Sequence, residues 1–449
     1  MLKELLKPEI QELIEYHNWN DLKVVLSSWP APEISDLLLD IDKRDKVLLF
    51  RTLPKEISAE VFSYLEYEEQ DELIRQFTDQ ETKELLAGLT PDDRTALLEE
   101  LPARVTLRLL NLLSPEDLRE ARELLGYPEE SIGRLMTPDF VAIRPEWTIK
   151  EALEHIRKFG KDSETINRIY VTDTKGKLLD DILLRYIILA PETEIVDNLL
   201  DYNVVSVSAF DDQEHAVRAM EKYDISAIPV VNSEGQLVGI VTFDDIMDIS
   251  KEEVTEDFQK ISGINPFDVS YTNASVWHLW AKRIPWLFFL LIANFLTTGV
   301  ISFYSDEITA VVALTFFIPM LIGTGGNTGT QSATLVIRGL STGDVVLKDW
   351  LKILSKELLV GLSLGVVLGL VAYFRGLFVD ENHTEIALVI SGAMVILVVW
   401  ANIIGALFPL LFYKLKLDPA VISSPFISTF VDVTGLLIYF NIAHLVLDL

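Results

Sequence analysis

Five long apolar segments in the C-terminal part of the sequence restrict the fold most strongly. They cover residues 284–304, 308–337, 351–374, 384–412 and 419–447. Each is long enough to cross the hydrocarbon core of a membrane, which is about 30 Å thick. Up to residue 270 the chain is charged and mixed instead. The sequence therefore predicts a water-soluble part joined to a membrane part of five helices.

The second apolar segment contains a polar stretch, GTGGNTGTQS, at residues 323–332. Irregular polar backbone at membrane depth is tolerated only where protein buries it or where it lines water, and interrupted helices often mark transport sites. We therefore expect the second helix to be interrupted here and to line an ion path. The stretch contains no Lys or Arg, which argues against a phosphate-binding loop. The expected lining residues are Gly325, Gly326, Asn327, Thr328 and Gln331.

Asp432 lies near the middle of the fifth apolar segment, in SPFISTFVDVTGLL. A carboxyl group at that depth costs about 3 kcal/mol or more and by default marks an ion or proton path. The alternative is a carboxyl group buried against a hydroxyl of another helix. If two chains met on a two-fold axis, two Asp432 carboxylates would face one divalent ion and balance its charge.

Oxygen ligands surround Asp432 in the sequence. Its hydroxyl neighbours are Ser423, Ser424, Ser428, Thr429 and Thr434. Pro425 should interrupt the helix and free carbonyl groups nearby. Hard oxygen ligands suit Mg²⁺ or Ca²⁺ rather than soft metals. Among these residues we expect Ser424, Pro425 and Ser428 to line the ion path.

The negative charge is concentrated in the soluble part. Residues 271–449 contain 9 Lys and Arg against 11 Asp and Glu, so residues 1–270 carry -28 of the total net charge of -30. Acidic side chains often only solvate helical surfaces, but here even the segment next to the membrane is acidic, where basic residues are usual. Such a surface repels nucleic acid and attracts cations.

The basic residues around the apolar segments predict the orientation. Eight lie on the side of the soluble part, and only Arg375 lies on the opposite side. The soluble part and the N-terminus are therefore expected in the cytoplasm, and five crossings place the C-terminal Leu449 outside. The first residues lack the pattern of a signal peptide, and the absence of cysteine excludes thiolate metal sites. We expect a multi-pass protein of the cell (inner) membrane.

Residues 1–130 show apolar residues at helical spacing between recurring breaks such as SWPAPEISDLL, RTLPKEISAEV and GLTPDDRTALL. Each break resembles a helix start, with a proline at the first position and acids in the first turn. Short helices stacked as a superhelix are predicted. No catalytic constellation is present in this segment.

The pattern β-α-β-β-α occurs twice in residues 131–249 and resembles a tandem CBS domain, a regulatory module that often binds adenine nucleotides. MTPDFVAIRPEWTIKEALEHIRK is echoed by DYNVVSVSAFDDQEHAVRAMEK. In that family the Thr and Asp of GIVTFDD, here Thr242 and Asp245, contact phosphate and ribose, so ATP is a candidate ligand. The alternative is that both residues cap the following helix. The first repeat reads DDILLRY and lacks the motif.

The stretch DIMDISKEEVTEDFQKI, at residues 245–261, predicts a helix that leads to the first apolar segment. Residues 250–270 are assigned to this connecting helix. Its acids fall on more than one face. The connecting helix is therefore expected to contact a cytoplasmic ion site while it links the two parts.

Taken together, these features resemble the MgtE family of bacterial magnesium channels. The resemblance covers the whole chain, and its most specific motifs are PMLIGTGGNTGTQSATLVIRGL and LDPAVISSPFISTFVDVTGLLIY. It implies a multidomain fold: an all-α superhelical N-domain (1–130), α/β tandem CBS domains (131–249), a connecting or plug helix (250–270) and a five-helix transmembrane domain (271–449).

The resemblance also implies a homodimer whose pore is lined by the second and fifth helices. The aspartate matching Asp432 binds hydrated Mg²⁺ in that family, and Asp418 matches a residue that faces the plug helix. The implied cytosolic magnesium ligands are Asp245, Asp248, Glu252, Glu253, Glu256 and Asp257. Ser424 stands where members of the family often have Asn, which is tolerable if only its backbone carbonyl is used.

The sequence thus predicts a magnesium-selective channel that cytosolic Mg²⁺ closes, and not an enzyme. An ion-coupled exchanger of divalent cations remains an alternative, because it would use the same Asp432. An intramembrane metalloprotease would need an H-E-x-x-H helix, which the sequence lacks. A chloride channel would need groups that attract anions, whereas the predicted charge in mid-membrane is negative.

Overall fold

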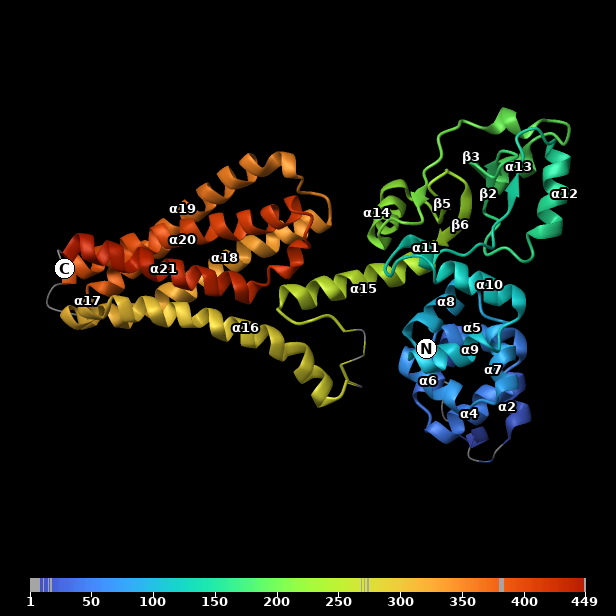
Figure 1. Ribbon diagram of the computed structural model, residues 1–449, viewed down its shortest axis with the longest axis horizontal. Coiled ribbons are helices and arrows are strands. Elements are labelled where there is room, and N and C mark those ends of the chain that lie inside the picture. The colour runs from blue at the N-terminus through green and yellow to red at the C-terminus, as the bar shows by residue number, and fades with distance from the viewer. Residues whose placement is uncertain are drawn as a thin grey trace. The chain divides into compact units, whose positions relative to one another are not determined.

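The computed structural model describes residues 9–447 apart from 11, 15, 17, 268, 270, 273 and 379–382. The chain divides into two compact units, Met1–Ser250 and Lys251–Leu449 (Figure 1). The first unit contains short helices and two small sheets. The second contains long helices.

The N-terminal domain consists of short helices, as the sequence predicts. Prolines begin several of them, because Pro91 and Pro115 occupy a first helical turn whose N–H groups have no partner within the helix. Thr78 and Glu81 form a reciprocal capping box at another start. The helices are α2 (Trp19–Leu26), α3 (Ala31–Leu39), α4 (Lys43–Thr52), α5 (Lys55–Ser63), α6 (Tyr67–Gln76), α7 (Asp79–Leu86), α8 (Pro91–Glu100), α9 (Ala103–Leu110) and α10 (Pro115–Leu124).

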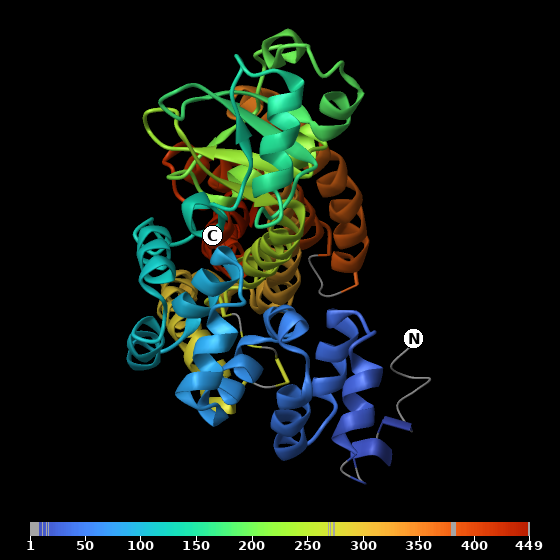
Figure 2. The same ribbon diagram turned by 90° about the vertical axis from the view of Figure 1, so that its right-hand side faces the viewer.

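The CBS pair forms two three-stranded sheets, ordered β1-β2-β3 and β4-β5-β6. Their strands are among the green and yellow-green arrows in Figure 2. In each sheet the first two strands are parallel and the last two antiparallel. The first repeat comprises α11 (Ile132–Leu135), β1 (Ala142–Ile143), α12 (Ile149–Phe159), β2 (Arg168–Thr172), β3 (Leu178–Leu183), α13 (Leu184–Leu189) and η1 (Val196–Leu199). The second comprises β4 (Val207–Ser208), α14 (Gln213–Tyr223), β5 (Ala227–Val231), β6 (Leu237–Thr242) and α15 (Phe243–Ile261). The sequence echo is therefore a structural repeat.

The hairpin turns of the two repeats are built alike. Gly176 and Gly235 adopt φ values of 81° and 78°, which glycine reaches without steric cost. The preceding polar residues, Asp173 and Asn232, accept backbone N–H groups of the turn through their side chains.

Helix α15 serves both the CBS pair and the connection to the second unit. It begins at Phe243, directly after β6, and continues to Ile261. The division between the units falls inside it, after Ser250. The predicted helical stretch 245–261 thus lies in one continuous helix, whose second half is the connecting segment.

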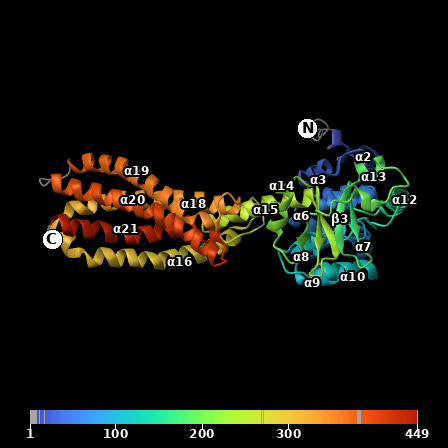
Figure 3. The same cartoon turned by 90° about the horizontal axis from the view of Figure 1, so that it is seen from above.

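The second unit is a bundle of long helices (Figure 3). Its elements are α16 (Val276–Phe303), α17 (Ser305–Ala310), η2 (Val312–Phe317), α18 (Ile318–Ser341), η3 (Leu347–Asp349), α19 (Trp350–Gly376), α20 (His383–Lys414), η4 (Pro419–Val421) and α21 (Ser424–Leu447). Among the described residues, four segments are long and apolar enough to cross a membrane: Val276–Phe303, Leu347–Gly376, Thr384–Lys414 and Ser424–Leu447. Helix α18 is not among these four, and it contains the stretch GTGGNTGTQS.

The glycine repeat of α19 packs against α20. A Cβ on Gly365 would lie 2.9 Å from the backbone O of Val395, and a Cβ on Gly376 would lie 2.8 Å from Cα of Ala387. Gly361, Gly365 and Gly369 recur at four-residue spacing, which favours close helix contact, and an ideal Cβ on each of them would meet atoms of α20.

Two predicted helix breaks are wrong. Helix α18 runs without interruption through GTGGNTGTQS, because a helix satisfies its own backbone hydrogen bonds, and Gly325, Gly326 and Gly329 pack against neighbouring helices. The break in the second apolar segment lies earlier, at η2. Pro425 likewise does not interrupt a helix. It is the second residue of α21, where its missing N–H costs nothing.

Candidate functional site: the α18–α21 seam and the two ends of α15

The glycines of α18 bring its backbone close to α21. A Cβ on Gly325 would lie 2.9 Å from Cγ1 of Val431, and one on Gly326 would lie 3.1 Å from Oγ of Ser428. Thr330 Oγ1 lies 3.3 Å from Ser428 Oγ. These distances leave no room for larger side chains, so the glycines are explained by helix packing.

Asp432 belongs to a polar stripe on α21. Ser424, Ser428 and Asp432 follow one another at four-residue spacing, which places them on one face of the helix. All three are half-buried. Among the residues that the structure describes, Asp432 has no hydrogen-bond or ion-pair partner. The stripe therefore ends in a carboxyl group whose charge nothing in the described chain balances.

The remaining hydroxyl groups expected around Asp432 have other partners. Ser423 is 1% exposed and accepts the indole N–H of Trp286 at 2.8 Å. Thr429 and Thr434 donate to carbonyl groups of their own helix. Only Ser424 and Ser428 share the stripe with Asp432.

The structure divides the predicted lining residues of α18 into two groups. Gly325, Gly326 and Thr328 are buried, and Thr328 donates to the backbone O of Thr324. Asn327 and Gln331 are exposed. Because Thr334 is exposed on the same side, α18 presents a polar face that the other described residues do not cover.

Glu357 is a carboxyl group within an apolar segment that was not among the residues predicted from the sequence. It is the eighth residue of α19, is half-buried, and accepts the hydroxyl proton of Ser332 on α18 at 2.9 Å. A sequence signal for depth was present, because Glu357 follows the helix start at Trp350 by seven residues, or about 10 Å at 1.5 Å per residue.

The C-terminal end of α15 is attached to the second unit by an ion pair. Lys260 Nζ lies 2.7 Å from Asp418 Oδ2 and 2.6 Å from Glu256 Oε1. Burial opposes the charge of Lys260, yet its hydrogen bonds to Asp418 and Glu256 raise its pKa. Asp418 thus meets α15 through a cation that belongs to the chain itself.

Further contacts hold the same end of α15. Asp257 accepts the hydroxyl proton of Ser341, the last residue of α18, at 3.1 Å, and burial raises the pKa of Asp257. Gly263, with φ 72°, lies so close to Trp286 that a Cβ would be 2.4 Å from its ring. Of the other predicted cytosolic ligands in this helix, Asp248 and Glu252 are exposed and Glu253 is half-buried.

The N-terminal end of α15 lies among acidic side chains of the first unit. Burial, and next the charge of Asp92, raise the pKa of Asp245 to about 8. Burial and Asp92 also raise the pKa of Asp93 to about 6. Asp244 contributes to both shifts. Helices α8 and α15 therefore bring carboxyl groups from distant parts of the sequence together.

Asp92 was not singled out from the sequence, although it is a central member of this group. It is 9% exposed, and its Oδ1 has no hydrogen-bond partner among the described residues. A buried carboxyl oxygen of this kind suits a hard cation such as Mg²⁺. No three Asp, Glu or His side chains of the described chain converge closely enough to coordinate a metal in this conformation.

Thr242 and Asp245 contact each other as helix-capping residues do. Thr242 Oγ1 donates to Asp245 Oδ2 at 2.5 Å, and the Thr242 backbone N–H points to the same oxygen at 3.4 Å. The geometry is that of the capping alternative, because Asp245 stands three residues into the helix that Thr242 precedes.

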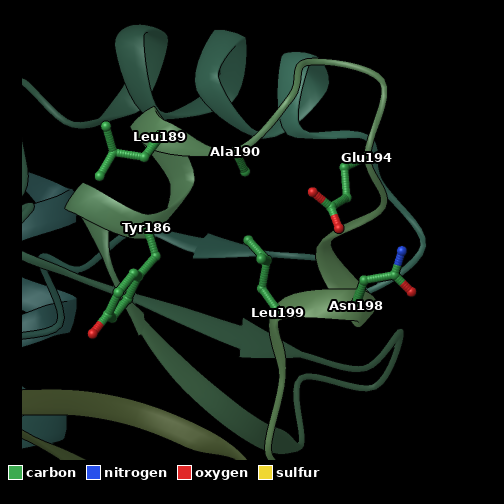
Figure 4. A pocket seen from close by; sticks show the side chains of 6 residues that line it. All are labelled: Tyr186, Leu189, Ala190, Glu194, Asn198 and Leu199. Atoms are coloured by element: carbon green, nitrogen blue, oxygen red, sulfur yellow. The ribbon is translucent and has the colours of Figure 1, made fainter.

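A separate open pocket of about 450 Å³ lies on the first CBS repeat. In Figure 4, Glu194 and Asn198 lie on one side of it, and Tyr186 and Leu189 lie on the other. Neither Thr242 nor Asp245 lines this pocket. It therefore gives no support to the nucleotide contacts predicted from the sequence.

An acidic helical domain, a CBS pair and a bundle of apolar helices with an unbalanced carboxyl group define a membrane cation transporter that carries its own regulatory domains. The matches to family models agree: divalent cation transporter MgtE (residues 318–442), MgtE intracellular N domain (29–130) and CBS domain (132–191 and 196–252). The chain belongs to the MgtE family.

Similarity to characterised relatives extends over the whole chain. The magnesium transporter MgtE of Thermus thermophilus is 38% identical over 450 residues, which cover 100% of both chains. The magnesium transporter MgtE of Bacillus subtilis is 35% identical over 71% of this chain and 70% of that protein. These relatives are transporters, so the expectation that the chain is not an enzyme is confirmed.

The soluble unit also resembles solved structures. The cytosolic domain of the Mg²⁺ channel MgtE in complex with ATP is 35% identical, with a TM-score of 0.52, and covers 54% of this chain and 98% of that one. The soluble part of a magnesium transporter is 28% identical, with the same TM-score of 0.52, and covers 56% of this chain and 98% of that one.

Proposed function

We propose that this chain forms a magnesium channel of the cell membrane that cytosolic Mg²⁺ closes. The observation that carries the proposal is Asp432, a carboxyl group without a counter-charge at the end of a polar stripe on α21. Membrane proteins seldom retain such a group unless a cation or proton uses it. The magnesium transport named for the relatives supports Mg²⁺ as the ion.

The polar face of α18 supports a homodimer with five crossings per chain. Asn327, Gln331 and Thr334 are exposed in the single chain, and lipid cannot satisfy their hydrogen-bonding groups. A second copy and a shared water-filled path would cover them. Helix α18 then crosses the membrane as the second of five spans, although its own apolarity is low. The basic flanks place the N-terminus in the cytoplasm and the C-terminus outside.

The proposed path would carry Mg²⁺ with most of its water. The ion releases water reluctantly, so Asp432 and the Ser424 and Ser428 hydroxyls would contact the hydrated ion. Entry needs no pump, because two charges gain about 4.6 kcal/mol per 100 mV of inside-negative potential. Such a path must close when cytosolic Mg²⁺ is high, because the cell would otherwise accumulate too much of the ion.

The acidic groups of the soluble unit would sense Mg²⁺ and control this closure. Asp92, Asp93 and Asp245 include a buried, unpartnered oxygen and raised pKa values, and together they offer the carboxylate donors that Mg²⁺ prefers. Bound Mg²⁺ would neutralise them and favour the arrangement in which α15 closes the path. It can do so only by binding the closed state more tightly than the open state. The other proposed ligands are Asp248, Glu252, Glu253, Glu256, Asp257 and Asp418.

ATP is a candidate second ligand of the CBS pair. The support is the solved cytosolic domain of a related channel, which is in complex with ATP. Thr242 and Asp245 remain the proposed contacts in this chain. Binding would have to replace or extend the hydrogen bond that joins them.

Replacing Asp432 tests the proposal. Asp432→Ala should reduce Mg²⁺ flux into proteoliposomes to background, because the hydrated ion loses the charged group of the path. Asp344→Asn, which removes an exposed carboxyl group elsewhere in the second unit, is the matched control. Flux at the parent level in a correctly inserted Asp432→Ala protein would contradict the assignment.

Electrical recording separates a channel from a coupled exchanger. A channel passes unitary currents carried by Mg²⁺ alone, whereas an exchanger stops when the counter-ion is withdrawn. Flux that requires a proton or sodium gradient would favour the exchanger.

A further inference from the structure

Ser332 joins three helices of the second unit. Its hydroxyl, on α18, donates to Oε2 of Glu357 on α19 at 2.9 Å and lies 3.0 Å from the backbone O of Asn402 on α20. The Asn402 side chain points back to the backbone O of Glu357 at 3.4 Å. Ser332 and Asn402 are 4% and 2% exposed, so their hydrogen-bonding groups depend on protein partners. We call these three residues the Ser332 junction.

The helix surfaces next to the junction are lined by glycines, which have no side chains. A Cβ on Gly405 of α20 would lie 2.3 Å from the backbone O of Gly329, and one on Gly361 of α19 would lie 3.2 Å from Nδ2 of Asn402. Glycine contacts permit close approach, but they have no side chains that interlock. Hydrogen bonds are directional, so the junction specifies the position of α18 along its axis better than the glycine contacts do.

The junction is close to the polar stripe of α21. Ser332 follows Thr330 by two residues, and Thr330 Oγ1 lies 3.3 Å from Ser428 Oγ, one helical turn before Asp432. A displacement of α18 by one residue would move its polar face by about 1.5 Å relative to α21. Shifts of that size are large for a site that must recognise an ion with its water.

From these contacts we infer that Glu357 is a positioning residue of the ion path: through Ser332 it holds α18 in register with α21, and it does not itself contact the ion. Its side chain acts in the junction as a hydrogen-bond acceptor. Glu357→Gln should therefore preserve the function, because a Gln carbonyl oxygen also accepts the Ser332 proton. Glu357→Ala and Ser332→Ala should impair the function, because each removes one partner of this hydrogen bond.

Cysteine cross-linking measures the register directly, because the parent chain has no cysteine. The pair Thr330→Cys with Ser428→Cys joins α18 and α21 at two hydroxyls that are 3.3 Å apart. The pair Gly376→Cys with Ala387→Cys joins α19 and α20 where a Cβ on Gly376 would lie 3.0 Å from Ala387 Cβ, and it serves as the control. Both are placed in the full chain in liposomes, and disulfide formation is timed with a mild oxidant.

We expect Glu357→Ala and Ser332→Ala to slow the α18–α21 cross-link on the order of tenfold, as expected for the loss of a hydrogen bond to a charged group. The control cross-link should keep its rate. Glu357→Gln should leave both rates within about twofold of the parent. In Mg²⁺ flux, the two Ala variants should raise the KM about tenfold, whereas Glu357→Gln should not.

The flux arm rests on the proposed function, but the cross-linking arm does not. If the parent protein carries no Mg²⁺, the proposed function fails and the cross-link rates still decide the role of Glu357. Parent-like cross-linking in both Ala variants would overturn the inference. So would loss of flux in Glu357→Gln with normal cross-linking, because the charge itself would then be used. If Glu357→Ala fails to fold, Ser332→Ala, which removes one hydroxyl, decides the question.

Discussion

The two ends of helix α15 lie in opposite electrostatic surroundings. At the N-terminal end, the charges that most affect Asp245 are those of the carboxyl groups Asp92 and Asp244. At the C-terminal end, Lys260 pairs with Glu256 and Asp418. One end thus consists of carboxyl groups that repel one another, and the other already contains a cation.

This difference assigns different roles to the two ends. A divalent ion gains most where it relieves desolvated like charges, and at the other end it must compete with Lys260. We therefore expect the N-terminal end to sense Mg²⁺. The C-terminal end would transmit the effect of Mg²⁺ binding to the ion path. It is attached to α18 through Ser341 and to Asp418, which precedes α21.

The largest expected effect follows from removing the charges of the N-terminal end. In the double variant Asp92→Asn and Asp245→Asn, the ratio of flux at low to flux at high internal Mg²⁺ should shrink about tenfold or more, because the ion loses its differential affinity for the closed state. Flux into proteoliposomes at varied internal Mg²⁺ measures it. Glu221→Gln, an exposed change on α14, is the control. An unchanged ratio would place the sensor elsewhere.

The raised pKa values at the N-terminal end of α15 predict that the stability of this region depends on pH. Folded-state pKa values of about 6 for Asp93 and about 8 for Asp245 exceed the usual value near 3.9. The folded state therefore binds more protons between about pH 4 and pH 8, and the stability of this region is lost as the pH rises through that window.

Hydrogen exchange, corrected for its intrinsic pH dependence, checks this prediction. Without Mg²⁺, the first turns of α8 and α15 should lose protection by up to about tenfold for each pH unit between pH 6 and pH 8, because this window lies between the unfolded and folded pKa values of Asp245. Mg²⁺ at pH 8 should restore it. Protection that is equal or greater at pH 8 without Mg²⁺ would contradict the prediction.

A smaller effect is expected at the C-terminal end. Lys260→Gln removes the cation that pairs with Asp418, so α15 should be held less firmly and flux at low internal Mg²⁺ should rise about two- to fivefold. Lys260→Arg keeps the charge and should behave like the parent. Identical flux in both variants would show that the ion pair does not hold α15.

The smallest effect concerns the cap of α15. Thr242→Val removes the hydroxyl that donates to Asp245 and should lower the free energy of opening of the first turn by about 0.5–1 kcal/mol. Thr242→Ser keeps the hydroxyl and is the matched control. Hydrogen exchange at residues 243–246 compares the two. Equal protection in both would show that the hydroxyl contributes nothing.

Much of the architecture could be predicted because the relevant signals act within one element. Apolar length, proline and acid at helix starts, and the echo of one repeat in the next depend on neighbouring residues. They located the helical domain, the CBS pair and the apolar helices. The four-residue spacing of Gly361, Gly365 and Gly369 is a signal of the same kind, because it favours close helix contact. It did not show that the partner is α20.

Asp432 could also be found from the sequence, because one charge among apolar residues needs no partner to be conspicuous. Asp92 could not, since its significance arises from Asp245, which lies far away in the chain. Glu357 is visible in the sequence as a charge within the third apolar segment, but its acceptor role is visible only when Ser332 is placed against it.

The stretch GTGGNTGTQS shows most clearly what the tertiary structure decided. The sequence alone determined that its residues are small and polar, and this composition was interpreted as an interrupted helix. In the structure the helix is continuous, and Gly325 and Gly326 let it approach Val431 and Ser428 of α21 closely. Sequence spacing determines which residues share a helix face. Which helix that face meets depends on packing across the whole bundle, and this decides whether a glycine breaks a helix or lets another one approach.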